Sequence, residues 1–320
     1  MSANTPSRIL VAWPVAFFTI VMGLAGFTLA LRAVEAQLGM TALLSTGAFM
    51  LTALVFAVVA LGYLVKLLRH REAVLAEWNH PVKLAFFPAM SISMLLIAAI
   101  VLPYSQGAAS VIWLVAVALQ LVLTISVISG WISHRAFQHG HLTPAWFIPV
   151  VGNVIAPIAG APLGFVELST FFMAAGLIFW VSLLSLVMNR LIFHDPLPER
   201  LMPTLVILIA PPAIGFVGWT QLVGGVDLFA RLLLNVAFLF ALIVAVQLPR
   251  ILRVPFSLSF WALSFPVAAL STASLLYGGA MGSPVHSGIG LGVFAVLCVI
   301  LGMLILRTIA AIRSGAAFEA

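Results

Sequence analysis

Long runs of apolar residues follow one another along the whole chain, separated by short polar connections. A helix needs about 20 mainly apolar residues to cross the hydrocarbon core of a bilayer. The runs therefore predict ten transmembrane helices, an all-α integral membrane protein, and a single transmembrane domain over residues 1–320, because no connection is long enough for a soluble domain. The approximate bounds are 9–31, 41–67, 82–102, 109–132, 143–163, 165–189, 201–222, 228–248, 256–278 and 285–307.

The placement of charge supports this topology. Only 7% of the residues are charged, against about 25% in typical soluble domains. The net charge of +6 does not indicate a nucleic-acid partner, because the charges lie between the apolar runs. With ten spans, twelve Lys and Arg residues fall on one side of the bilayer and two, Arg32 and Arg231, on the other. The positive-inside rule then places both termini in the cytoplasm and the protein in the inner (plasma) membrane.

Prolines divide the ten runs into two kinds. Interior prolines occur only in the third, fifth, seventh and ninth runs, and the first run carries Pro14 near its start. Broken backbone at membrane depth needs partners inside the protein or a water-filled cavity. We therefore expect the odd runs to form an inner ring and the even runs an outer ring. The expected kinks are at Pro88, Pro149, Pro157, Pro211, Pro212 and Pro266.

The ionisable residues favour transport over catalysis. No Asp, Glu, Lys, Arg or His lies deep within a predicted span, whereas intramembrane proton relays use such groups. A membrane enzyme would need a buried acid–base pair, and we find none. His134, His139 and His141 cluster near one loop, but their spacing matches no strong ligand pattern. We therefore expect no metal and no cofactor.

The inner runs instead carry uncharged polar groups, which could line a path for anions. Any one of them is more often bonded back to its own helix than exposed to a pore. Five are the main candidates, namely Thr19, Ser91, Asn153, Ser264 and Ser271, and the wider set adds Ser93, Ser257, Ser259 and Thr272. Broken helices also free backbone dipoles that could face an anion.

Four stretches resemble one known family along essentially the whole chain. They are "VLAEWNHPVKLAFFPA" (74–89), "TPAWFIPVVGNVIAP" (143–157), "IAPPAIGF" (209–216) and "RVPFSLSFWALSFPVAALS" (253–271). They are similar to the third, fifth, seventh and ninth helices of the tellurite-resistance/dicarboxylate transporter family, which includes bacterial TehA and the plant slow anion channels. The ninth-run pattern W-A-x-S-F-P most resembles the plant channels, since TehA commonly has Gly where this chain has Pro266.

The resemblance implies five helical hairpins in a quasi-fivefold array around a central pore, assembled as a homotrimer with one pore in each protomer. It also implies that Phe265 projects into the bore as a gate. On this basis we expect an anion channel or channel-like exporter that passes small monovalent anions. The alternative is a secondary carrier for C4-dicarboxylates, sulfite or tellurite-related anions, because the family contains both channels and exporters.

Overall fold

The computed structural model describes residues 6–133 and 137–318, which fold into helices joined by short connections. Within these ranges, nine helices are long and apolar enough to cross a membrane. The tenth predicted run, 143–163, corresponds to the shorter apolar segment Pro144–Gly160. This run is therefore shorter than its predicted bounds and is broken, as its interior prolines led us to expect, and the number of complete crossings stays a prediction. Pro144, Pro149 and Pro157 each remove a backbone donor, and no long α-helix accommodates them.

The inner segments share one construction, in which a 3₁₀ stretch leads into an α-helix. The fifth run forms four short pieces instead of two. The pairs are η1 (Val15–Phe17) with α2 (Phe18–Gln37), η2 (Lys83–Phe86) with α5 (Ala89–Val101), η6 (Glu199–Ile209) with α10 (Ala210–Val223), and η7 (Leu258–Leu263) with α12 (Ser264–Met281). The fifth run comprises η4 (Pro144–Trp146), α7 (Phe147–Val151), η5 (Gly152–Ile155) and α8 (Pro157–Gly160).

The predicted kink prolines mark where α-helices begin. Pro88 directly precedes α5, Pro157 opens α8, and Pro211 and Pro266 lie in the first turns of α10 and α12. The first four N–H groups of an α-helix have no partner within the helix, so proline removes no helical bond there. These four prolines therefore start α-helices and do not kink the middle of a continuous one. The two others are the third residues of their helices, Pro149 in α7 and Pro212 in α10.

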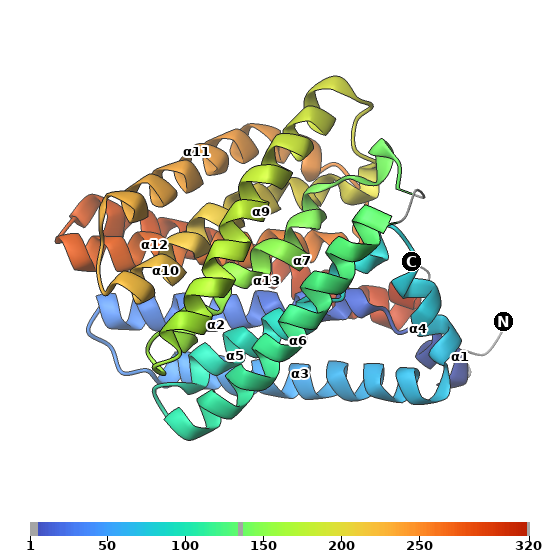
Figure 1. Cartoon of the computed structure of the whole chain (residues 1–320), viewed down its shortest axis with the longest axis horizontal. Coiled ribbons are helices and arrows are strands. Elements are labelled where there is room, and N and C mark those ends of the chain that lie inside the picture. The colour runs from blue at the N-terminus through green and yellow to red at the C-terminus, as the bar shows by residue number, and fades with distance from the viewer. Residues whose placement is uncertain (1–5, 134–136, 319–320) are drawn as a thin grey trace.

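The outer helices are long and uninterrupted, and over an apolar 18-residue stretch of each, 17–39% of the residues are buried, against 72–83% for the four long inner spans. This confirms the predicted division into inner and outer helices. In Figure 1, α3 and α11 lie along opposite edges of the molecule. The outer helices are α3 (Leu43–Arg69), α6 (Gln106–Ser133), α9 (Val166–Phe193), α11 (Leu228–Ile251) and α13 (Pro284–Ser314). α11 continues past its predicted end, so Pro249 falls in its last turn.

The inner segments contact one another in a closed circuit. α2 packs on α5, α5 on η5 and α8, these on α10, α10 on α12, and α12 again on α2. Each inner segment also packs on the outer helix that follows it in the chain, as the hairpin arrangement requires. Side chains facing the middle of this circuit therefore come from segments far apart in sequence.

The first run differs from its predicted bounds at both ends. A short helix, α1 (Pro6–Val11), ends before Pro14, and the membrane helix continues to Gln37. Arg32 and Glu35 therefore lie within α2, although the prediction ended this span at residue 31. Three further short elements connect the spans or close the chain: α4 (Arg71–Trp78), η3 (His139–His141) and η8 (Ala316–Phe318).

Candidate functional site

A first cavity of about 60 Å³ lies among the N-terminal parts of the inner segments. All five inner segments contribute to it, as Thr19, Phe86, Phe147, Pro211 and Ser259 illustrate. Its walls are largely apolar, and the described residues that line it include no charged side chain. An ion in this cavity would meet apolar side chains and neutral dipoles but no charged group among these residues.

A second cavity, of about 250 Å³, is lined by residues of four inner segments, α2, α8, α10 and α12. It also has apolar walls, but Gln221 and Thr272 add neutral polar groups and Arg32 adds a positive charge. The two cavities therefore differ in their electrostatics.

Phe265 and Ile214 line both cavities. Phe265 is the second residue of α12, where the 3₁₀ stretch gives way to the α-helix, and its side chain is 8% exposed. Ile214 comes from α10, which packs against α12. The two side chains thus border both cavities and are the candidates for a partition between them. A Cβ built at Gly26 of α2 would lie 3.0 Å from Phe265 Cδ2, so the ring is also in close contact with α2.

Of the five main polar candidates, Thr19 lines the first cavity. The other four are fully or almost fully buried, and neither cavity includes them among its lining residues. From the wider set, Ser259 lines the first cavity and Thr272 the second. The hydroxyl of Thr19 donates to the carbonyl of Ala16 at 2.7 Å, and that of Thr272 to Ala268 at 2.9 Å. The cavity hydroxyls therefore present acceptor oxygens more readily than donors.

Ser91 and Asn153 belong to a buried network with two residues of α6, Gln120 and Thr124. The Ser91 hydroxyl lies 2.6 Å from Gln120 Oε1, and the Thr124 hydroxyl donates to the Pro149 carbonyl at 2.8 Å. The Asn153 amide donates to the Thr124 hydroxyl at 3.3 Å. These bonds join α5, α6 and the broken fifth segment, and they supply a partner for a carbonyl in that irregular backbone. Gln120 and Thr124 were not among the predicted polar candidates, because they lie on an outer helix without interior proline.

Ser264 and Ser271 both bond to backbone carbonyls near or on α12. The Ser264 hydroxyl donates to the Trp261 carbonyl at 2.6 Å, and the Ser271 hydroxyl donates to the Gly290 carbonyl on α13 at 2.9 Å. The first bond closes the local turn between η7 and α12, and the second joins the helix that carries Phe265 to α13.

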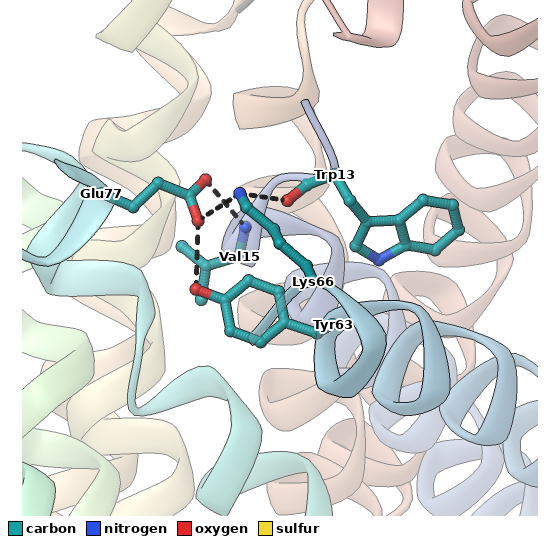
Figure 2. A network of polar contacts seen from close by, with 5 residues as sticks. All are labelled: Trp13, Val15, Tyr63, Lys66 and Glu77. Atoms are coloured by element: carbon teal, nitrogen blue, oxygen red, sulfur yellow. Dashed lines mark hydrogen bonds and ion pairs between the residues drawn. The ribbon is translucent and has the colours of Figure 1, made fainter. Parts of the chain in front are cut away.

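A buried ion pair lies at the end of the molecule that carries the N-terminal parts of the inner segments (Figure 2). Lys66 Nζ lies 2.8 Å from Glu77 Oε2 and also donates to the Trp13 carbonyl at 2.8 Å. The Tyr63 hydroxyl donates to Glu77 Oε2 at 3.0 Å, and the Val15 N–H donates to Oε1 at 3.3 Å. Figure 2 shows Trp13 and Val15, which flank Pro14, converging on this pair. The network joins α3, α4 and the break in the first run.

The histidines considered for metal binding take other roles where the structure describes them. His134 lies outside the described residues. His141 Nδ1 accepts the Gln138 N–H at 3.2 Å, and the ring of His139 stacks on His194 with centroids 4.7 Å apart. Among the described residues, no group of three or more His, Cys, Asp or Glu side chains could hold a metal ion.

Two groups outside the spans have altered acidity. Partial burial lowers the pKa of His80 because it disfavours the charged imidazolium, and the positive charge of Lys83 lowers this pKa further. The pKa of Asp227 is also lowered, mainly because its carboxylate accepts the Ala230 N–H at the start of α11 and secondly because it accepts the indole N–H of Trp219. His80 is therefore mostly neutral near pH 7, and Asp227 is charged.

The apolar helices and the cavities within their inner ring define a multi-pass membrane protein. Residues 13–309 match the protein family described as voltage-dependent anion channel (SLAC1), and the chain belongs to that family. This finding confirms the resemblance seen in the sequence.

Three relatives illustrate the range of the family. The S-type anion channel SLAH2 of Arabidopsis thaliana is 30% identical over 255 residues, which cover 78% of this chain and 49% of that protein. The tellurite resistance protein TehA homolog of Haemophilus influenzae is 26% identical, with 95% and 92% covered. The uncharacterized transporter MJ0576 of Methanocaldococcus jannaschii is 24% identical, with 86% of each chain covered. The chain thus spans about half the length of the plant relative and most of the two microbial ones.

Proposed function

We propose that the protein is an anion channel or channel-like exporter in which small monovalent anions move down their gradient through the two cavities. The observation that supports the proposal is that two cavities among the inner segments share two lining residues, Phe265 and Ile214, which we take as the partition between them. The first cavity has no charged side chain among its described lining residues, so an anion there is not held tightly. Conduction requires such weak sites. The plant relatives are named as anion channels, which supports the same assignment.

In this proposal Phe265 is the gate. Its ring blocks the path and presents an apolar surface, which disfavours a continuous column of water. Ile214 completes the closed partition from α10. The hydroxyls of Thr19, Ser259 and Thr272 line the cavities but donate to backbone carbonyls, so the proposal does not depend on them as donors to an anion.

Phe265→Ala tests the gate, with Phe147→Ala as the matched control. Both changes remove an aromatic ring that lines the first cavity, but only the first removes one that also lines the second. In planar bilayers we expect Phe265→Ala to raise anion current well above wild type, and Phe147→Ala to leave it near the wild-type value. Equal currents in all three proteins, at equal reconstituted amounts, would contradict the gate assignment. Saturable flux without unitary current would favour a secondary carrier instead.

We further propose a homotrimer of five-hairpin protomers in the inner membrane, with both termini in the cytoplasm. The 12:2 division of Lys and Arg supports the orientation, and the contacts of Phe318 with Phe17, with ring centroids 6.0 Å apart, support termini on the same side. Cross-linking and mass measurement in detergent test the trimer.

A thiol-labelling experiment tests the orientation. A Gly225→Cys variant lacking Cys298 should react with an impermeant thiol reagent added outside cells, whereas an Asp195→Cys variant lacking Cys298 should not. The opposite pattern would reverse the topology.

A further inference from the structure

Arg32 has an unusual position for a cation in a membrane protein. It lies in α2, more than one turn before the helix ends at Gln37, and it lines the second cavity together with Phe265. Ionisable groups within membrane spans are costly and usually mark an ion or substrate path. The only other Lys or Arg predicted on this side of the bilayer, Arg231, lines neither cavity.

Neutral partners hold the guanidinium in place. Arg32 Nη1 donates to the Ile100 carbonyl at 3.0 Å, and Nη2 donates to the Tyr104 hydroxyl at 2.9 Å. The guanidinium also lies over the Tyr104 ring, 5.0 Å from its centroid. These contacts orient the group without neutralising it. A guanidinium has five N–H donors, so donors remain beyond these two bonds.

The carboxylate in the same helix, that of Glu35, makes no ion pair with Arg32, although its Oε2 is buried without a hydrogen-bond partner among the described residues. Glu35 Oε1 accepts the N–H groups of Leu44 and Ser45 at the start of α3, at 2.8 and 3.1 Å. Within the described part of the chain, Arg32 has no carboxylate at ion-pair distance. Its charge is therefore available to the second cavity, where Gln221 and Thr272 are the other polar side chains.

We propose that Arg32 forms a weak binding site for a small monovalent anion in the second cavity, on the far side of the partition from the first. This inference rests on the proposed anion transport. It adds a residue that raises the local concentration of anions in the second cavity, at one end of the path. Arg32 is half-buried, so solvent screens part of its attraction and a bound ion can leave.

Three variants in the open Phe265→Ala background test the site. Arg32→Gln removes the positive charge from the second cavity. Arg32→Lys keeps the charge but replaces the planar guanidinium with an ammonium group. Arg231→Gln removes a charge outside the cavity and is the control. We expect Arg32→Gln to lower chloride conductance severalfold in 10 mM salt, and Arg32→Lys and Arg231→Gln to leave most of it. The loss should shrink in 1 M salt, because the screening length falls from about 30 Å to about 3 Å. Equal losses in the Gln and Lys variants at both salt concentrations would show a structural role and overturn the inference.

A second measurement does not depend on current. Bromide soaked into crystals should give an anomalous peak beside Arg32, and the peak should be absent in Arg32→Gln. If the Phe265→Ala protein carries no current but bromide binds at Arg32, the transport proposal fails and the binding site stands. If current flows and Arg32→Gln changes neither the current nor the bromide peak, the binding site is wrong and the transport proposal stands.

Discussion

At the scale of single residues, the Lys66–Glu77 pair shows how a charge is accommodated inside an apolar protein. The two side chains are 2% and 10% exposed, and hydrogen bonds from Tyr63 and Val15 satisfy the carboxylate further. Val15 follows Pro14, so the pair also supplies a partner for an N–H next to the break in the first run. We infer that the pair holds the start of the first inner segment in place.

Breaking this pair should be costly. Glu77→Gln leaves the Lys66 ammonium buried without its counter-charge, and the expected loss of stability is about 3–5 kcal/mol. Thermal unfolding in detergent would measure this loss as a lower midpoint. Glu72→Gln, an exposed change in the same helix, is the control and should have little effect.

The double variant Lys66→Met/Glu77→Leu completes the test. It removes both charges at once, so no unpaired charge remains, and its midpoint should lie closer to wild type than that of Glu77→Gln. A double variant that is less stable than Glu77→Gln would show that the charge pair itself, and not the avoidance of an unpaired charge, provides the stability.

At the scale of elements, the packing of α12 on α13 determines how firmly the helix carrying Phe265 is held. In the "GIGLG" segment (288–292) of α13, Gly290 packs closely against α12. A Cβ there would lie 2.6 Å from Leu275 Cγ and 3.0 Å from Leu275 N. At Gly288 and Gly292, no heavy atom of the described residues lies within 4 Å of an added Cβ. The close approach also permits the Ser271–Gly290 hydrogen bond.

Gly290→Ala should therefore destabilise the protein, whereas Gly292→Ala should not. The added methyl at Gly290 meets a backbone nitrogen that cannot move aside, and overpacking of this kind costs about 1–3 kcal/mol. At Gly292 the same change adds a residue of higher helix propensity in open space. Unfolding midpoints of the two variants, measured side by side, decide the matter, and equal midpoints would argue against close packing at Gly290.

At the scale of the whole molecule, the apolar first cavity should determine which anions pass. Interactions with dipoles alone do not fully compensate for the free energy that an ion loses when its water shell is removed. Weakly hydrated anions should therefore permeate more easily than strongly hydrated ones. In the Phe265→Ala protein we expect nitrate and iodide to exceed chloride, and sulfate to be nearly excluded. Bi-ionic reversal potentials measure this order.

The carrier alternative makes a different prediction for the same measurement. A stereospecific site would favour malate over other anions of similar size and charge. If chloride exceeded nitrate, or malate exceeded both, the dehydration argument would be wrong. The site would then have to be sought where polar groups gather around the cavities, with Thr19 and Ser259 in the first and Arg32 in the second.

The sequence by itself determined the class of protein, the family, and the division into inner and outer helices. Those features depend on local properties: hydropathy along a run, and the missing N–H of proline. Only the tertiary structure decided which side chains face the cavities. Ser91 and Asn153 looked equivalent to Thr19 in the sequence, but their rotation about the helix axis directs them to α6. The Lys66–Glu77 ion pair, and the position of Phe265 and Ile214 beside the same two cavities, likewise required the fold, because each pair comes from separate helices and no local pattern specifies it.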